Sequence, residues 1–366
     1  MRKVAVIPAV VLAALCTFTG CKKEEVENVI APLVSDGQTT ESTEEAQEEK
    51  DPLIPEIDTS VEIQAGSRVA VVSKSTSGEF WGLVKKGMEQ AIADVNEAYG
   101  FKKEDQVTMT FEGASDEKDV ESQVNTIDAV IAENPDVLCV SASDMDSLQA
   151  QLEAAKENGI PVVAFDSGVT DSKMVRAFRG TDNTRVGEIA AYRLATAIGK
   201  MGKVAVFSAQ EKTQSIQERV SGFTNYITNY PDIEVVEIVY QDQVDDMTAA
   251  MQEVLDKYPQ LGGVFCDNAD IADLYLDMKK DETKDSIVMV GVDATAKQQE
   301  AIWNSKEVGV VSQQPYAMGY QTIWTALLTT APKKSVEIKR NVRIDPAWID
   351  SSNIDDPTYS SYLYAN

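Results

Sequence analysis

The sequence predicts an α/β protein built from two Rossmann-like lobes, each containing a parallel sheet. From Arg68 onward, short runs of β-branched residues alternate with amphipathic segments. Strand–helix alternation of this kind builds parallel sheets through right-handed crossovers. The strand candidates are almost continuously apolar, which indicates burial on both faces. About five strand signals fall in residues 68–178 and about five in residues 203–312, which indicates two lobes of similar organisation.

The expected strands are Val69–Ser73, Val107–Phe111, Val137–Ser141, Val162–Asp166, Met174–Phe178, Val204–Ser208, Val235–Tyr240, Val264–Cys266, Ile287–Asp293 and Val308–Ser312. The expected helices are Gly82–Ala98, Glu117–Glu133, Met145–Asn158, Arg185–Lys200, Ser215–Asn229, Met247–Lys257, Ala296–Asn304 and Met318–Thr330. No sequence repeat relates the two halves, so we expect their similarity in topology alone. Sheets of this type bind ligands at the carboxyl ends of their strands. The residues that follow each strand are therefore the candidate functional residues.

The first 20 residues are typical of an export signal. A short basic start precedes the apolar run Val4–Leu15, which is too short to span a bilayer as a permanent helix. The segment ends in FTGC, which resembles the lipobox of bacterial lipoproteins. That resemblance implies cleavage after residue 20 and attachment of diacylglycerol to Cys21, which would anchor the protein to the outer face of the cell membrane. The alternative is an ordinary signal peptide with an incidental cysteine.

Residues 21–65 are expected to contain the lipidated cysteine and an acidic disordered tether. The stretch Thr39–Lys50 (TTESTEEAQEEK) is densely charged and lacks aromatic residues. Such a segment buries too little apolar surface to offset the entropy lost on ordering. The two cysteines of the folded part, Cys139 and Cys266, lie in apolar runs, and we expect both to be buried and reduced.

The composition excludes several classes of function. The chain carries 60 acidic and 33 basic residues, a formal net charge of −27, so its surface repels phosphate backbones and nucleic acid is not an expected partner. The sequence contains no histidine, which removes the commonest general base and metal ligand. It also lacks GxSxG, a glycine-rich phosphate loop and clustered metal ligands. We therefore expect no catalytic centre, no metal and no cofactor.

An aromatic pair, Phe80 and Trp81, follows the first strand in a loop that leads into a helix. An aromatic plane buries the apolar C–H face of a sugar ring without using hydrogen-bonding groups. The pair is thus a candidate stacking platform. The alternative is that one of the two rings covers the hydrophobic layer.

Polar side chains follow the other strands. Asp166 ends the fourth strand, where a carboxylate accepts hydroxyl hydrogen bonds, although a turn or helix-cap role is the alternative. Arg219 lies near the start of a helix, where the macrodipole disfavours a cation, so we expect it to have a particular target. Asn268, Asp293 and Gln313 follow later strands, and each alone fits a cap or turn pattern. Together they place a carboxylate or carboxamide at nearly every strand end.

In this order and spacing the residues resemble the sugar-binding type I periplasmic binding proteins. The resemblance covers about residues 67–343 and includes the motif Arg219-x-x-Gly222-Phe223. It implies that aromatic residues sandwich a pyranose or furanose while Asp, Arg, Asn and Gln fix its hydroxyls. The matching positions here are Phe80, Trp81, Asp166, Arg219, Asn268, Asp293 and Gln313.

The same resemblance implies a type I fold whose lobes are joined by a three-segment hinge, near residues 179–181, 313–314 and 341–343. The N-terminal lobe is expected to comprise residues 66–179 plus 314–340, and the C-terminal lobe residues 180–313 plus 341–366. The tail after the third crossing is expected to return to the second lobe, with its aromatic residues packing there rather than binding ligand.

The function expected from this sequence is capture of a monosaccharide or related polyol by a monomeric extracytoplasmic lipoprotein. The bound solute is then delivered to an ABC-type importer in the membrane. The alternative is a receptor that presents a sugar-like signal to a sensor kinase or chemoreceptor, and nothing in the chain separates the two. A transcription regulator of the lac-repressor type is excluded, because an export signal and acidic tether stand where such regulators carry a helix-turn-helix.

Overall fold

The computed structural model describes residues 51–280, 286–331 and 337–365. Its first sheet is formed by β1 (Arg68–Ser75), β2 (Thr108–Ala114), β3 (Val137–Val140), β4 (Val162–Phe165), β5 (Ala177–Thr181) and β11 (Asn341–Ile344). The helices of this lobe are α2 (Gly78–Tyr99), α3 (Val120–Ala132), α4 (Gln149–Glu157) and α10 (Pro315–Thr330).

The second sheet is formed by β6 (Gly202–Ser208), β7 (Ile233–Tyr240), β8 (Leu261–Cys266), β9 (Val288–Val292), β10 (Gly309–Ser312) and β12 (Ala347–Asp350). Its helices are α5 (Asn183–Ala197), α6 (Gln214–Ile227), α7 (Met247–Lys257), α8 (Ala269–Met278) and α9 (Ala296–Trp303). Helix α8 and strands β11 and β12 were not predicted from the sequence. Among the residues with described coordinates, no helix is both long and apolar enough to cross a membrane.

The strand orders of the two sheets correspond position by position. The first sheet runs β11-β5-β4-β3-β1-β2 and the second β12-β10-β9-β8-β6-β7. Neighbouring strands are parallel, except that β12 pairs antiparallel with β10. The predicted α/β class with two parallel-dominated sheets is confirmed.

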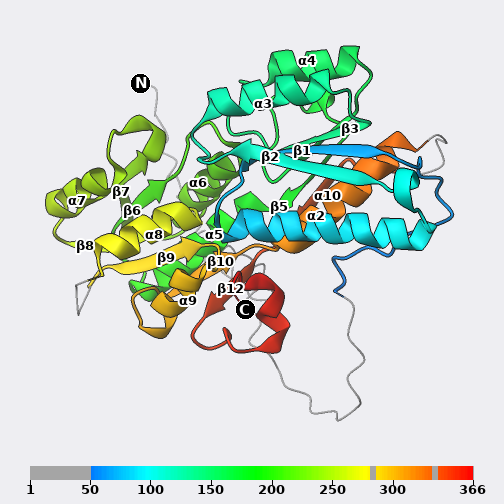
Figure 1. Cartoon of the computed structure of the whole chain (residues 1–366). Coiled ribbons are helices and arrows are strands. Elements are labelled where there is room, and N and C mark those ends of the chain that lie inside the picture. Colours follow the sequence, from blue (N-terminus) through cyan, green and yellow to red (C-terminus); the bar gives the residue numbers. More distant parts are fainter. Residues whose placement is uncertain (1–50, 281–285, 332–336, 366) are drawn as a thin grey trace, which may run out of the picture. The chain divides into compact units, whose positions relative to one another are not determined.

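Both faces of the first sheet are buried, as the apolar strands predicted. Along β1, Val69 and Val71 pack into one cluster with residues of α2 and α10, while Ala70 and Val72 pack into another with residues of α3 and α4. Figure 1 shows these two helix pairs on opposite sides of the strands. Cys139 on β3 and Cys266 on β8 are buried and free, as expected.

Close packing of one helix pair in each lobe depends on a glycine. Gly319 is the fifth residue of α10, and a Cβ there would lie 2.1 Å from the backbone oxygen of Val84 in α2. Gly187 is the fifth residue of α5, and a Cβ there would lie 2.1 Å from the backbone oxygen of Arg219 in α6. The two helix pairs therefore approach to backbone contact at equivalent places, and in the second lobe this contact positions Arg219.

The chain crosses between the sheets after β5, between β10 and α10, and between β11 and β12. The second crossing lies at residues 313–314, where it was expected. The third was expected at 341–343, but Val342 pairs with Arg179 of β5, so residues 341–344 belong to the first sheet. The first crossing likewise follows Thr181, the last residue of β5. The second lobe therefore resumes only after Ile344.

The predicted disordered tether does not extend to residue 65. Val61 and Ile63 are buried against the core of the first lobe. The hydroxyl of Tyr99 donates to the backbone oxygen of Val61 over 2.6 Å, and Gln321 donates to that of Leu53 over 2.8 Å. Residues 51–65 are ordered because apolar residues stand among the acidic ones and pack on the lobe. The high charge of the whole segment led to the prediction of disorder. The predicted signal, Cys21 and the rest of residues 1–50 lie outside the described residues.

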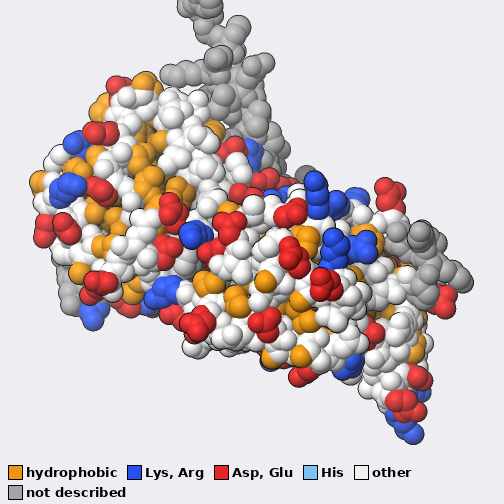
Figure 2. All heavy atoms as spheres, turned by 90° about the horizontal axis from the view of Figure 1, so that it is seen from above, with side chains coloured by type: hydrophobic (Ala, Val, Ile, Leu, Met, Phe, Trp, Pro, Cys, Tyr) orange, Lys and Arg blue, Asp and Glu red, His pale blue; other side chains and the backbone are white. Residues whose placement is uncertain are grey.

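The segment after β12 packs on the second lobe, as expected. Ile349 and Ile354 join a buried cluster there, and Tyr359 and Tyr362 of the 3-10 helix η5 (Pro357–Tyr362) pack against it. On the face drawn in Figure 2, carboxylates (red) lie over both halves, with lysines and arginines (blue) between them.

Candidate functional site

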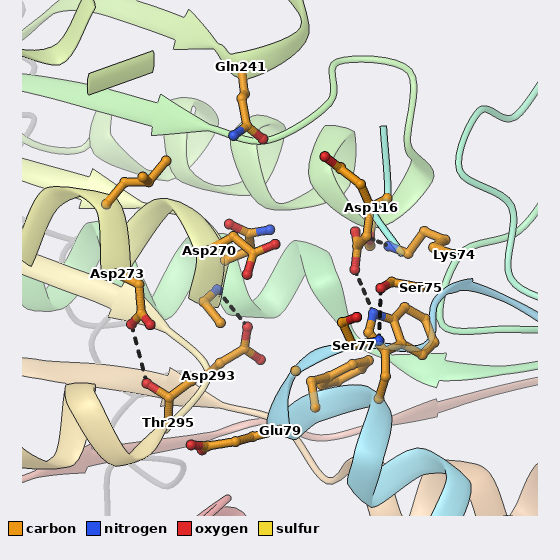
Figure 3. A pocket seen from close by; sticks show the side chains of 18 of the residues that line it. Lys74, Ser75, Ser77, Glu79, Asp116, Gln241, Asp270, Asp273, Asp293 and Thr295 are labelled. Atoms are coloured by element: carbon orange, nitrogen blue, oxygen red, sulfur yellow. Dashed lines mark hydrogen bonds and ion pairs between the residues drawn. The ribbon is translucent and has the colours of Figure 1, made fainter. Parts of the chain in front are cut away.

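The residues predicted to bind a ligand lie around one cavity of about 760 Å³, formed where the strand ends of both sheets meet. The first lobe contributes Phe80, Trp81 and Asp166, the second contributes Arg219, Asn268 and Asp293, and Gln313 lies at the second crossing. Figure 3 shows Lys74, Ser75 and Ser77 on one side of this cavity and Asp270, Asp273 and Asp293 on the other.

The two predicted aromatic residues have different environments. Trp81 is only 3% exposed, belongs to the core of the first lobe, and donates its indole N–H to Glu117 Oε1 over 2.7 Å. Phe80 is half-buried and meets Trp81 edge to face, with 5.1 Å between ring centroids. The alternative that one ring covers the hydrophobic layer therefore holds for Trp81, whereas Phe80 is the more accessible ring at the cavity.

Asp166 is buried and stands in a left-handed backbone conformation, with φ of 54°. Its Oδ2 lies 3.0 Å from Lys74 Nζ and accepts hydrogen bonds from Ser141 (2.9 Å) and Ser167 (3.0 Å). Oδ1 accepts no hydrogen bond within the described part of the chain. All three partners thus hold the same carboxylate oxygen of Asp166.

Lys74, near the end of β1, is a site residue that was not predicted from the sequence. Phe80 and Trp81, which were expected in a loop, are the third and fourth residues of α2, because the helix begins earlier than predicted. The ammonium of Lys74 is 3.5 Å from Glu117 as well as 3.0 Å from Asp166. Burial by itself would lower the pKa of Lys74, but the two carboxylates outweigh burial and hold that pKa above its ordinary value. Burial would conversely raise the pKa of Asp166, and the charge of Lys74 holds it below its ordinary value. Both groups are therefore charged at neutral pH.

Arg219 extends from α6 and is 3% exposed. Its Nε donates to Asn183 Oδ1 over 2.8 Å, and Nη1 donates to the backbone oxygen of Asp267 over 2.8 Å. The remaining nitrogen, Nη2, donates to none of the described residues. Two of the partners expected for this arginine are therefore the Asn183 side chain and the backbone after β8. Together they hold the guanidinium at the cavity.

Asp293 and Gln313 form one network. Asp293 Oδ1 accepts from Gln313 Nε2 over 2.7 Å and from the hydroxyl of Tyr364 over 2.8 Å. Its Oδ2 accepts from the backbone N–H of Ala269 over 2.9 Å. The Oε1 of Gln313 accepts from Thr181 on β5, so the network spans the crossing between the lobes. Gln313 thus uses both ends of its amide on protein partners, although it also lines the cavity.

Asn268 caps α8, because its Oδ1 accepts from the backbone N–H of Ile271 over 2.9 Å. The side-chain oxygen of Asn268 therefore has the helix-capping role that was the alternative to ligand binding. Two residues further on, Asp270 is exposed and lines the cavity, where partial loss of hydration and the nearby Glu117 and Asp293 raise its pKa to about 6.

Beneath these residues, Asp267 is fully buried at the end of β8. It accepts hydrogen bonds from Ser208 and from the backbone N–H of Ala209. Burial, only partly offset by these bonds and by Arg219, raises the pKa of Asp267 to about 6.

The lobes touch each other beside the cavity. Glu79 of α2 accepts from the backbone N–H of Ala296, at the start of α9, over 3.0 Å. The hydroxyls of Ser167 and Ser215 lie 2.9 Å apart. Among the described residues that line the cavity, acidic side chains outnumber basic ones. The acidic residues are Glu79, Asp116, Glu117, Asp166, Asp270, Asp273, Asp277 and Asp293, and the basic residues are Lys74, Lys118, Arg219 and Lys297.

A two-lobed α/β chain with a polar cavity at facing strand ends defines the class of a solute-binding protein. The sequence model of the family described as "Periplasmic binding protein domain" matches residues 69–331, and the chain belongs to this family. The predicted resemblance to type I sugar-binding members is confirmed by the relatives. Members of this family are extracytoplasmic transport proteins and not enzymes, as expected.

One such relative is the ribose import binding protein of Bacillus subtilis, which is 27% identical over 203 residues. The matching segment covers 56% of this chain and 66% of the relative, slightly under two thirds of its length.

The fold is similar to that of solved binding proteins over their whole length. An ABC transporter solute-binding protein from Agrobacterium vitis with bound D-fucose is 28% identical, with a TM-score of 0.74, and the match covers 81% of this chain and 100% of that one. A second protein from Agrobacterium vitis, bound with α-D-tagatopyranose, is 26% identical with a TM-score of 0.74, covering 82% of this chain and 100% of that one.

Proposed function

We propose that this protein binds a monosaccharide or a related polyol between its lobes and delivers it to an ABC-type importer. The observation that carries the proposal is the convergence of Phe80, Asp166, Arg219 and Asp293 on one cavity from separate strand ends of two sheets. An accessible ring beside fixed charged hydrogen-bonding groups matches the two chemical aspects of a sugar, an apolar ring face and a rim of hydroxyls.

In this proposal each group has one role. The ring of Phe80 covers the apolar face of the sugar. Asp166 Oδ1 and Arg219 Nη2, which have no other described hydrogen-bonding partner, bind hydroxyls from opposite lobes, and Asp293 Oδ2 accepts another. Because the site groups are buried, an analogue that lacks a hydroxyl leaves one of them unpaired, which gives specificity by polar matching.

The preferred solute carries no negative charge. Asp166 is already neutralised by Lys74, and Arg219 already donates to Asn183 and to a backbone oxygen. The remaining lining is predominantly acidic, so a sugar acid would meet repulsion at the cavity opening.

The test is a thermal-shift screen followed by titration calorimetry with D-ribose, D-fucose, D-tagatose and, as the anionic control, D-glucuronate. We expect at least one neutral sugar to raise the melting temperature and to bind with a micromolar or tighter Kd, because a ligand that binds only the folded state stabilises it. D-glucuronate is expected to have no effect. Absence of any shift across a wider set of neutral monosaccharides and polyols would refute the proposal.

We further propose that residues 1–20 are removed and that a diacylglyceryl group on Cys21 anchors a monomeric protein to the outer face of the membrane. The FTGC segment supports this. Expressed in a bacterial host, the full chain is expected in the membrane fraction, with a mature mass increased by the lipid, whereas Cys21→Ala is expected to lose both properties. Equal fractionation of the two proteins would contradict the anchor.

A further inference from the structure

The segment that follows β12 extends to the ligand cavity. Its residue Tyr364 is 7% exposed, and the backbone N–H of Tyr364 donates to the oxygen of Ala294 over 3.1 Å. Two residues earlier, the backbone oxygen of Tyr362 accepts from the hydroxyl of Ser312 over 2.6 Å. These bonds fix the segment against the ends of β9 and β10, next to Asp293.

Tyr364 contacts one ligand-site residue from each lobe. Its hydroxyl donates to Asp293 Oδ1 over 2.8 Å, and its ring centroid lies 6.1 Å from that of Phe80. Tyr364 itself does not line the cavity. Burial and the negative charge of Asp293 raise the pKa of Tyr364 well above its ordinary value, so the hydroxyl keeps its proton and remains a donor across the physiological range.

The carboxylate of Asp293 is held by three donors, and each comes from a different part of the chain. They are the amide of Gln313 at the crossing, the backbone N–H of Ala269 at the start of α8, and the hydroxyl of Tyr364. Asp293 also has a φ of 82°, a conformation that non-glycine residues rarely adopt and that surrounding contacts must maintain.

We propose that Tyr364 is a positioning residue for the binding site. It orients the carboxylate of Asp293 toward the ligand and contacts the ring of Phe80 at a tilt of 53°, so that the segment after β12 forms part of the site. The proposal rests on the proposed sugar-binding function for its affinity measurement, but not for its second measurement.

The first measurement compares Tyr364→Phe with Tyr359→Phe by titration with the neutral sugar that binds the wild type best. Tyr364→Phe keeps the ring and removes only the hydroxyl, and we expect Kd to rise about tenfold, the effect of one hydrogen bond to a charged group. Tyr359 lies in the same segment, and its hydroxyl makes no described hydrogen bond, so Tyr359→Phe is expected to bind within about twofold of the wild type.

The second measurement needs no ligand. The backbone N–H of Ala269 bonds to Asp293 Oδ2, so its hydrogen exchange reports whether that carboxylate is held in place. In Tyr364→Phe we expect this amide to exchange about fivefold to tenfold faster. The amide of Ala272, which bonds to the backbone oxygen of Asn268 in the same helix, is expected to be unchanged. A merely structural role for Tyr364 would change both amides together.

If Tyr364→Phe does not fold, Ser312→Ala provides the same test with Tyr364 intact. It removes the bond to Tyr362 that fixes the segment, and we expect a smaller loss of affinity, about threefold, and faster exchange at Ala269. Wild-type affinity and wild-type exchange at Ala269 in the variant that folds would overturn the proposal. If the wild type binds no sugar, but the Ala269 amide still exchanges faster in Tyr364→Phe than in the wild type, the sugar-binding function fails while the positioning role of Tyr364 stands.

Discussion

At the end of the fourth strand of each sheet stands an aspartate with a positive φ, Asp166 after β4 (54°) and Asp293 after β9 (82°). Asp166 is held by a lysine and two hydroxyls, whereas Asp293 is held by an amide, a phenol and a backbone N–H. Repetition of the strand order places equivalent carboxylates at the cavity, but each lobe fixes its carboxylate with different chemistry.

The charge at the site therefore differs between the lobes. In the first lobe a buried cation neutralises the carboxylate. In the second lobe Arg219 donates to Asn183 and to a backbone oxygen, and Asp267 below it has a pKa raised to about 6. The difference indicates that the first lobe is preorganised by an ion pair, whereas the second carries negative charge that its surroundings compensate only in part.

The largest expected effect comes from breaking the ion pair of the first lobe. Lys74→Met leaves the buried charge of Asp166 without its cation, and we expect a loss of about 3–5 kcal/mol in the free energy of unfolding at pH 7. The comparison in the second lobe is Asp267→Asn, which keeps the hydrogen-bonding shape and removes a poorly compensated charge. At pH 7 it is expected to leave the free energy of unfolding unchanged or to raise it, by at most about 3 kcal/mol. Urea denaturation measures both, and similar losses would contradict the asymmetry.

The helix pairs should respond alike in the two lobes. Gly187→Ala and Gly319→Ala each bring a Cβ to 2.1 Å from a backbone oxygen, and we expect each to cost about 3 kcal/mol. Gly82→Ala is the control, because no atom lies within 4 Å of its added Cβ and alanine favours a helix. Only Gly187→Ala should also impair sugar binding in the molecules that fold, since it displaces the backbone of Arg219. Unchanged melting of either variant would show that the helices have room to separate.

The two buried aspartates should give opposite pH dependence. The folded pKa of Asp166 is depressed, so its contribution to stability is present above the unfolded value of about 4 and is lost as pH falls through the folded value. The folded pKa of Asp267 is raised to about 6, so its contribution is present below about pH 4 and is lost as pH rises through 6, by at most about 3 kcal/mol. Melting temperatures of Asp267→Asn between pH 4 and 7 should therefore fall less with rising pH than those of the wild type; parallel curves would contradict the shift.

The smallest of these effects concerns the half-buried ring of Phe80. Phe80→Ala removes the proposed stacking surface, and we expect about a tenfold weaker Kd for the best neutral sugar, with a modest change in melting temperature. The control is Phe101→Ala, which removes a ring stacked on Tyr99 and outside the lining of the cavity. Trp81→Ala is not equivalent, because that ring belongs to the core and its loss is expected to destabilise the first lobe. Equal Kd values for Phe80→Ala and the wild type would remove the ring from the site.

The apolar strand pattern was enough to predict two sheets. The rule that parallel sheets bind ligands at the carboxyl ends of their strands then named residues that line a common cavity. Pairings between distant residues were not predictable. That Lys74 meets Asp166, and that Tyr364 meets Asp293, depends on which strand ends become neighbours, and periodicity does not encode this. The helix α8 was missed because Asn268 was interpreted as a ligand-type residue at a strand end, although it is also the cap of that helix. The strands β11 (NVRI) and β12 (AWID) were missed because charged or polar residues interrupt them, so they lack the continuous apolar run that marks an equally short strand such as β3 (VLCV).

The most direct test of the account is a crystal structure of the protein with the neutral sugar that binds it best. The account predicts one sugar ring lying on Phe80 in the cavity, with hydroxyls within hydrogen-bonding distance of Asp166 from one lobe and of Arg219 and Asp293 from the other. A sugar bound outside this cavity, or held by residues of a single lobe, would contradict it.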